Sequence, residues 1–97
     1  MSEYAMSPAL VESGDIYIEV YPMKVIPIED QDCTESRLIE QGETPDFYDV
    51  WLRPDDWDLN NGSAYGEWED LTRKDAEAKI AELEQLNPGI TVNWVMP

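Results

Sequence analysis

Alternating apolar and polar residues predict an early β-strand over residues 15–21. One side of this strand is aliphatic and consists of Ile16, Ile18 and Val20. The other side carries two tyrosines around a glutamate, namely Tyr17, Glu19 and Tyr21. Because successive side chains of a strand point to opposite faces, the aliphatic side should meet the core. Pro22 predicts a bulge or an edge position where the chain continues into residues 23–28.

Two more stretches predict strands over residues 47–53 and 64–69. In the first, Tyr48, Val50 and Leu52 share one face, and Phe47, Asp49, Trp51 and Arg53 share the other. Asn61-Gly62, between the two stretches, is the strongest turn signal in the chain. We therefore expect the two strands to pair as a hairpin. Residues 29–44 are polar and acidic, and we interpret them as mostly loop.

Apolar residues at helical spacing predict one main helix over residues 72–87. Its buried stripe consists of Ala76, Ile80, Leu83 and Leu86. Thr72 is the expected N-cap, with Asp75 three residues later. Asn87-Pro88-Gly89 should end the helix. A final strand is expected over residues 90–96, with Ile90, Val92 and Trp94 on one face.

This order of elements predicts a small α+β fold. We expect an antiparallel or mixed β-sheet of three to four strands, with the main α-helix of about residues 72–87 packed on one face. Ninety-seven residues suggest a single domain over 1–97, in which residues 1–14 form a flexible arm. One helix does not cover two faces, so an aromatic face with an acidic rim should remain open.

The charge of the chain is its most unusual property. Twenty-two acidic residues face six basic ones, which gives a net charge of −16. A magnitude of about 2–8 is enough to keep a small domain soluble, and stronger self-repulsion destabilises the compact state. Residues 29–70 hold fourteen acids and two bases, a net of −12. This excess disfavours direct binding to nucleic acid or anionic membranes, and it favours basic protein surfaces or divalent cations.

The residue types needed for common catalytic and cofactor sites are missing. Histidine is absent, and the single Cys33 builds neither an internal disulfide nor a cysteine-rich zinc site. No glycine-rich nucleotide motif is present. We therefore expect no enzymatic activity, no cofactor and no metal. A calcium-binding module is one alternative, because Asp56, Asp58, Asn60 and Glu67 match positions 1, 3, 5 and 12 of an EF-hand-type loop. Asn61 stands where that loop needs glycine.

The chain shows no secretory signal and no apolar stretch as long as a membrane span. One cysteine also fits a reducing compartment. We expect a cytoplasmic protein.

Residues 46–70 mix carboxylates with three of the four tryptophans. Trp94 is expected in the core, whereas Trp57, between two aspartates in a turn, is the best candidate for an exposed anchor. Tryptophan and tyrosine are favoured at protein interfaces, and surrounding carboxylates would steer a basic partner. The predicted partner-binding residues are Asp49, Trp51, Asp55, Asp56, Trp57, Asp58, Glu67, Trp68, Glu69 and Asp70.

In size, charge, lack of histidine and lack of catalytic motifs, the chain resembles the acidic DNA-mimic proteins of phages and mobile elements. These include anti-CRISPR and anti-restriction proteins. The resemblance implies an inhibitor that masks the basic surface of a nucleic-acid-handling protein, in the host cytoplasm if a phage encodes it. Such surfaces carry Lys and Arg for phosphates and often stacking platforms for bases. The chain is also similar in kind to acidic immunity proteins, which implies the alternative of neutralising a basic toxin. Mimicry of DNA and filling of an active site both remain open.

Overall fold

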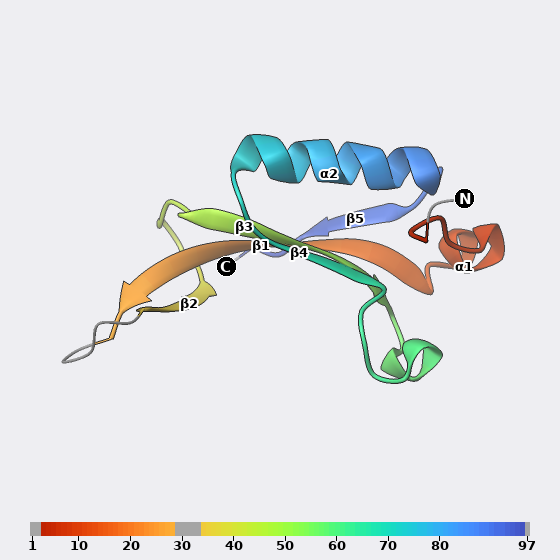
Figure 1. Ribbon diagram of the computed structural model, residues 1–97, viewed down its shortest axis with the longest axis horizontal. Helices are drawn as coiled ribbons and strands as arrows, with labels where there is room; N and C mark the ends of the chain where they lie inside the picture. Colours follow the sequence, from red (N-terminus) through yellow and green to blue (C-terminus); the bar gives the residue numbers. More distant parts are fainter. Residues whose placement is uncertain (1–2, 29–33, 97) are drawn as a thin grey trace.

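The computed structural model describes residues 3–28 and 34–96, which form a β-sheet with one long helix on one face (Figure 1). The elements in order are α1 (Pro8–Ser13), β1 (Ile16–Pro27), β2 (Thr34–Leu38), β3 (Phe47–Pro54), the 3-10 turn η1 (Trp57–Asn60), β4 (Gly66–Leu71), α2 (Arg73–Leu86) and β5 (Thr91–Trp94). The predicted α+β fold is confirmed. The described residues form five strands instead of the expected three to four.

The central strand of the sheet is β1, which is twelve residues long. On one side it pairs antiparallel with β3, which in turn pairs antiparallel with β4. Two short strands share its other side: β5 runs parallel to residues 17–20, and β2 runs antiparallel to residues 23–27. The sheet is therefore mixed.

Pro22 lies inside β1 without the bulge that the sequence suggested as one possibility. The carbonyl of Pro22 accepts a hydrogen bond from the Ile39 N–H at 3.1 Å, and the carbonyl of Val20 accepts one from Val95 at 2.9 Å. The backbone nitrogen and carbonyl groups of Val20 and Pro22 thus point to the edge of β1 that pairs with β5 and β2. The Pro22 nitrogen faces the gap between those two strands, so no ladder hydrogen bond is lost. The proline occupies a local edge position within a central strand.

Residues 34–38 form strand β2, which corrects the prediction that this stretch is loop. Its five residues pair with the far end of β1, and the two strands project beyond the core as a ribbon (Figure 1). Most of its side chains are exposed. Backbone pairing, not burial, therefore holds the strand, which explains why hydrophobic alternation does not reveal it. Residues 29–33 of the predicted loop lie outside the described residues.

The hydrophobic core lies between α2 and one face of the sheet. Its buried members are Val11, Ile16, Ile18, Val20, Val50, Leu52, Ala76, Ile80, Leu83 and Ile90. Trp94 packs against this cluster as predicted, although it is only partly buried. The helix runs from Arg73 to Leu86, close to the predicted limits, and the Thr72 hydroxyl accepts a hydrogen bond from the Asp75 N–H at 3.1 Å. No helix of the described residues is long and apolar enough to cross a membrane.

In place of the suggested arm, residues 8–13 form helix α1, which places Val11 in the core. Asn87 is only 2% exposed and links the residues that precede α1 to the end of α2. Its side chain accepts from the Met6 N–H at 2.6 Å and donates to the carbonyls of Tyr4 at 2.9 Å and Leu83 at 3.0 Å. One buried amide therefore anchors the N-terminal residues.

Candidate protein-binding face

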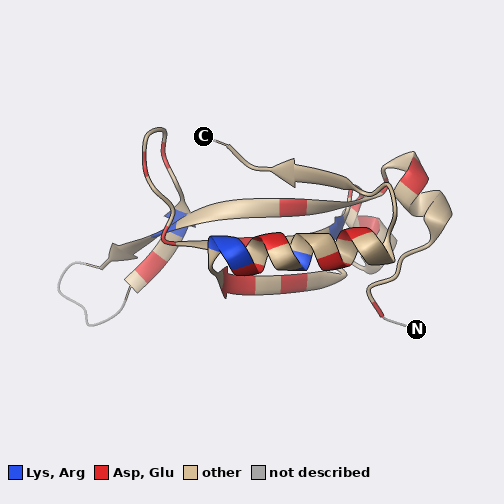
Figure 2. Ribbon diagram, turned by 90° about the horizontal axis from the view of Figure 1, so that it is seen from above, with Lys and Arg blue, Asp and Glu red and all other residues tan. Residues whose placement is uncertain are grey.

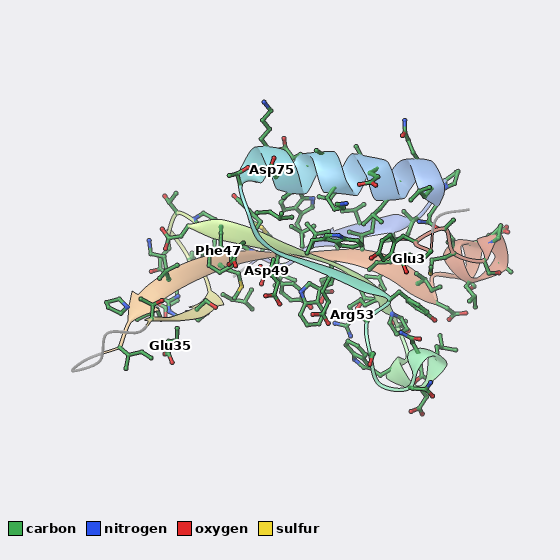
Figure 3. The ribbon with its side chains drawn as sticks, viewed as in Figure 1. Glu3, Glu35, Phe47, Asp49, Arg53 and Asp75 are labelled. Carbon is green, nitrogen blue, oxygen red and sulfur yellow. The ribbon has the colours of Figure 1, made fainter. Side chains whose placement is uncertain are left out.

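The face of the sheet opposite α2 is covered by no helix of the described residues. The strand registers place eight of its side chains, which we call the open face: Tyr17, Glu19, Tyr21, Asp49, Trp51, Arg53, Glu67 and Asn93. Figure 3 shows Asp49 and Arg53 on this side, away from α2 and its residue Asp75. The sequence correctly indicated that such a face would exist, because a single helix packs on only one side of the sheet.

Glu19 lies at the centre of the open face and is only 8% exposed. Its carboxylate accepts hydrogen bonds from Arg53 Nη1 at 3.0 Å, from Asn93 Nδ2 at 3.0 Å and from the Tyr21 hydroxyl. Burial alone would raise the pKa of Glu19, but the hydrogen bonds from Tyr21 and Asn93 and the charge of Arg53 hold it below its ordinary value. Burial and the Glu19 carboxylate raise the pKa of Tyr21 to about 12. The centre of the face is thus a charged carboxylate that is paired with Arg53 and accepts hydrogen bonds from three side chains.

The guanidinium of Arg53 is held between two aromatic rings. Its central carbon lies 4.4 Å from the ring centroid of Trp57 and 5.4 Å from that of Tyr17. Trp57 is partly buried, because turn η1 lies beneath the open face (Figure 1). The Asp56 carboxylate stabilises this turn by accepting from the Asp58 N–H at 2.9 Å. Trp57 therefore has a structural role that the sequence did not suggest, although part of its surface remains available for contact.

The hairpin of residues 47–71, formed by β3, η1 and β4, is rich in carboxylates that form no ion pair among the described residues. It holds seven carboxylates: Asp49, Asp55, Asp56, Asp58, Glu67, Glu69 and Asp70. Its one basic residue, Arg53, is already paired with Glu19 at 3.0 Å. The ion pairs found among residues 3–28 and 34–96 involve none of the seven. By contrast, α2 carries both basic and acidic segments (Figure 2), so its charges largely cancel.

A bulge in β4 places two of these acids beside Asp49. Two residues, Glu69 and Asp70, fit between positions where β3 has only Asp49. Asp70 adopts a left-handed backbone with φ 57°, and its N–H donates to Asp49 Oδ1 at 3.2 Å. Burial, with the charges of Glu69, Asp70 and Glu67, raises the pKa of Asp49 despite this hydrogen bond. The folded chain therefore keeps like charges together here at a cost in stability.

The predicted binding residues do not all lie on one surface. Asp49, Trp51 and Glu67 lie on the open face, while Asp55, Asp56, Trp57 and Asp58 form the adjoining turn, and Glu69 and Asp70 lie at the bulge. Trp68 is the exception, because it pairs with Val50 and faces α2. Its ring lies 4.9 Å from that of Tyr4 and 4.8 Å from Lys79 Nζ. The structure thus separates Trp68 from the other residues.

The predicted partner-binding residues do not include the β1 and β5 members of the open face. Tyr17 and Tyr21 stand on the same side as Glu19 in the predicted strand 15–21, so the alternation already indicated that they face away from the core. Asn93 directly precedes Trp94 in the last strand, so the alternation likewise turns it away from the core. The sequence did not show which strands are neighbours in the sheet. Because β1 pairs with β3 and with β5, these side chains lie beside Trp51 and Arg53.

The segment that resembles a calcium loop folds differently. The Asp56 carboxylate caps a short 3-10 turn, and the Asn60 amide donates to the carbonyls of Ser63 at 3.1 Å and Ala64 at 3.2 Å. Glu67 lies in β4. Within the part of the chain that the structure describes, no three acidic or cysteine side chains group in a way that could hold a metal ion. This segment therefore does not adopt the EF-hand-type loop that its spacing resembles.

A groove opens on the helix side, between the end of β5 and the end of β2. It has a volume of about 200 Å³, and its lining includes Pro22, Tyr48, Trp94 and Met96. Arg73 covers it, with its guanidinium carbon 4.4 Å from the ring centroid of Trp94. This groove is apolar with one cation, so it does not attract a basic partner.

No protein-family model, curated protein or solved structure matches the chain.

Proposed function

We propose that the chain is a non-enzymatic acidic inhibitor that binds and masks a basic surface of a nucleic-acid-handling protein. The hairpin of residues 47–71 and the open face form the binding surface. The observation that carries this proposal is the presence of seven carboxylates, without a cationic partner among the described residues, beside a partly exposed aromatic face. A charge arrangement that destabilises the free protein is understandable if a cationic partner neutralises it on binding.

The surface has the layout of a protein interface. Aromatic rings lie at its centre, where Tyr21 and Trp51 meet edge to face with their centroids 5.6 Å apart. Exposed carboxylates lie at its margin in η1 and β4. Aromatic residues supply large contact area at the centre of interfaces. Carboxylates at the rim speed the approach of a basic partner and make the association depend on salt.

The charge density of the molecule supports competition with nucleic acid. A net charge of −16, spread over all faces of the molecule, lies within a longest dimension of 49 Å. One strand of B-DNA carries one charge per about 3.4 Å of helix axis. A protein groove that neutralises phosphates at that spacing would also attract this chain. This supports a mode of action of the anti-CRISPR or anti-restriction kind, in which the inhibitor occupies the nucleic-acid site.

The buried carboxylate of the face supports a binding role over acid–base catalysis. Glu19 accepts hydrogen bonds from three side chains and has a pKa below its ordinary value. A general acid or base works best when its pKa lies near the operating pH. Glu19 is therefore held as an anion at neutral pH, hydrogen-bonded to Tyr21 and Asn93 and paired with Arg53.

A capture experiment tests the proposal. The chain is immobilised and exposed to nuclease-treated host extract, and bound protein is then challenged with a short DNA duplex. A face variant combines D49N, E67Q and E69Q. A control variant combines E12Q, E82Q and E84Q on the helices, and so removes the same number of charges. We expect a basic protein that the duplex displaces, that the face variant fails to capture and that the control variant retains.

Two other results would have different meanings. Capture that resists the duplex yet is lost in the face variant would favour the alternative role, neutralisation of a basic toxin. Capture that is indifferent to the duplex and equal in all three proteins would refute the proposal, because neither nucleic-acid competition nor the charges of the face would then matter.

A further inference from the structure

Three of the four tryptophans stack against a cationic side chain of the same chain. The pairs are Arg53 over Trp57 at 4.4 Å, Arg73 over Trp94 at 4.4 Å and Lys79 over Trp68 at 4.8 Å. Trp51 is the fourth, and among the described residues no cationic side chain lies over its ring. The fold thus pairs each tryptophan with a cation except the one at the centre of the open face.

The surroundings of Trp51 suit a cation. Glu67 lies directly opposite it on β4, and Asp49 precedes it by two residues on the same face of β3. Neither carboxylate forms an ion pair among the described residues. The indole nitrogen of Trp51 is buried, so the exposed part of this side chain is carbon. Carboxylates on either side of a partly exposed indole attract a positive charge.

The neighbouring residue on the strand shows how this surface holds a guanidinium. Arg53 follows Trp51 by two residues on the same face, and it rests on two aromatic rings while Glu19 accepts its hydrogen bond at 3.0 Å. Trp51, Asp49 and Glu67 offer the same combination of ring and carboxylate. In this second case the cation is not supplied by the described chain.

We propose that Trp51, flanked by Asp49 and Glu67, receives an arginine side chain of the partner. This inference rests on the proposed function and names the group that the surface recognises. Arginine fits better than lysine because its planar guanidinium stacks on a ring and donates to two carboxylates at once. It is also less strongly hydrated than an ammonium group. The partner's contact surface should therefore be rich in arginine, with one guanidinium on the indole of Trp51.

Fluorine NMR of the chain labelled with 5-fluorotryptophan tests the inference. Ten-residue peptides of arginine and of lysine are titrated at equal ionic strength, and the Trp51 signal is identified with W51F. We expect the arginine peptide to shift the Trp51 signal more than the other three and to bind about threefold more tightly than the lysine peptide. In W51L this preference should disappear while the lysine affinity stays the same.

A second pair of variants guards against a folding defect in W51L. E67Q changes an exposed side chain on β4, and E84Q changes an exposed side chain on α2. E67Q should reduce the arginine preference, and E84Q should leave it intact. Equal affinities for both peptides, with the Trp51 signal moving no more than the others, would overturn this inference while leaving charge-driven binding in place. Absence of binding to either peptide at low salt would overturn the proposed function as well.

Discussion

Replacing Glu19 with glutamine should be one of the most destabilising single changes on the open face. The substitution keeps the shape of the side chain and removes its charge. Arg53 would then retain its positive charge with its side chain only 17% exposed and no carboxylate beside it. The glutamine amide can still form hydrogen bonds with Tyr21 and Asn93, so the loss measures the ion pair more than the packing.

The expected magnitude follows from the burial of the pair. Breaking a fully buried pair by removing one partner costs about 3–5 kcal/mol, whereas an exposed pair contributes about 0–1 kcal/mol. The Glu19 and Arg53 side chains are 11% and 17% exposed. Arg53 also keeps its contacts with two rings, so we expect a loss of about 2 kcal/mol. In a domain of this size that lowers Tm by about 8–16 °C.

Thermal unfolding followed by circular dichroism measures this loss, with E77Q as the matched control. Glu77 pairs with Arg73 at 2.8 Å, slightly closer than Glu19 and Arg53, but both side chains are more than half exposed. E77Q should therefore change Tm far less. The double variant E19Q/R53Q should recover part of the loss, because no uncompensated charge remains. Equal shifts in E19Q and E77Q would show that the central network does not stabilise the face.

Three further outcomes are expected. D49N should raise Tm at neutral pH, because burial and neighbouring carboxylates raise the pKa of Asp49, and the gain should shrink in high salt; an unchanged or lower Tm would contradict the account of the bulge. Since the pKa of Glu19 is depressed, its stabilisation exists above the pKa of the unfolded chain and is lost as the pH falls through the folded value. The unfolding midpoint of the wild type should therefore fall more steeply than that of E19Q below about pH 5, and parallel curves would refute this reading. N87A should cost about 1–3 kcal/mol and speed hydrogen exchange in residues 3–14, and unchanged exchange there would show that Asn87 does not anchor this segment.

Burial explains which parts of the fold could be predicted from the sequence. Strands β1 and β3 and helix α2 each place regularly spaced apolar side chains in one core, so their periodicity reveals them. Strand β2 buries little, and its pairing depends on the length of β1 beyond the core. Helix α1 has only six residues, too few for a clear period. Elements held by backbone pairing or by one buried side chain therefore escape this kind of prediction.

The candidate site was predictable in its charge and less so in its geometry. The excess of carboxylates in residues 47–71 is visible in the sequence, and strand alternation places Asp49 and Trp51 together. The Glu19–Arg53 pair joins residues thirty-four positions apart, so only the pairing of β1 with β3 reveals it. Trp68 was included with the site because of its acidic neighbours, although β4 turns it toward α2. The composition of the chain identifies the acidic hairpin, but only the pairing of the strands shows which side chains share the open face.

The dependence of partner affinity on salt tests the central claim most directly. The dissociation constant of the captured partner is measured at several ionic strengths for the wild type, for D49N/E67Q/E69Q and for E12Q/E82Q/E84Q. We predict that the wild type and the control variant share a steep slope of log Kd against log salt, and that the face variant binds more weakly with a shallower slope. Equal slopes for the face variant and the control variant would contradict the claim that the open face and its hairpin form the binding surface.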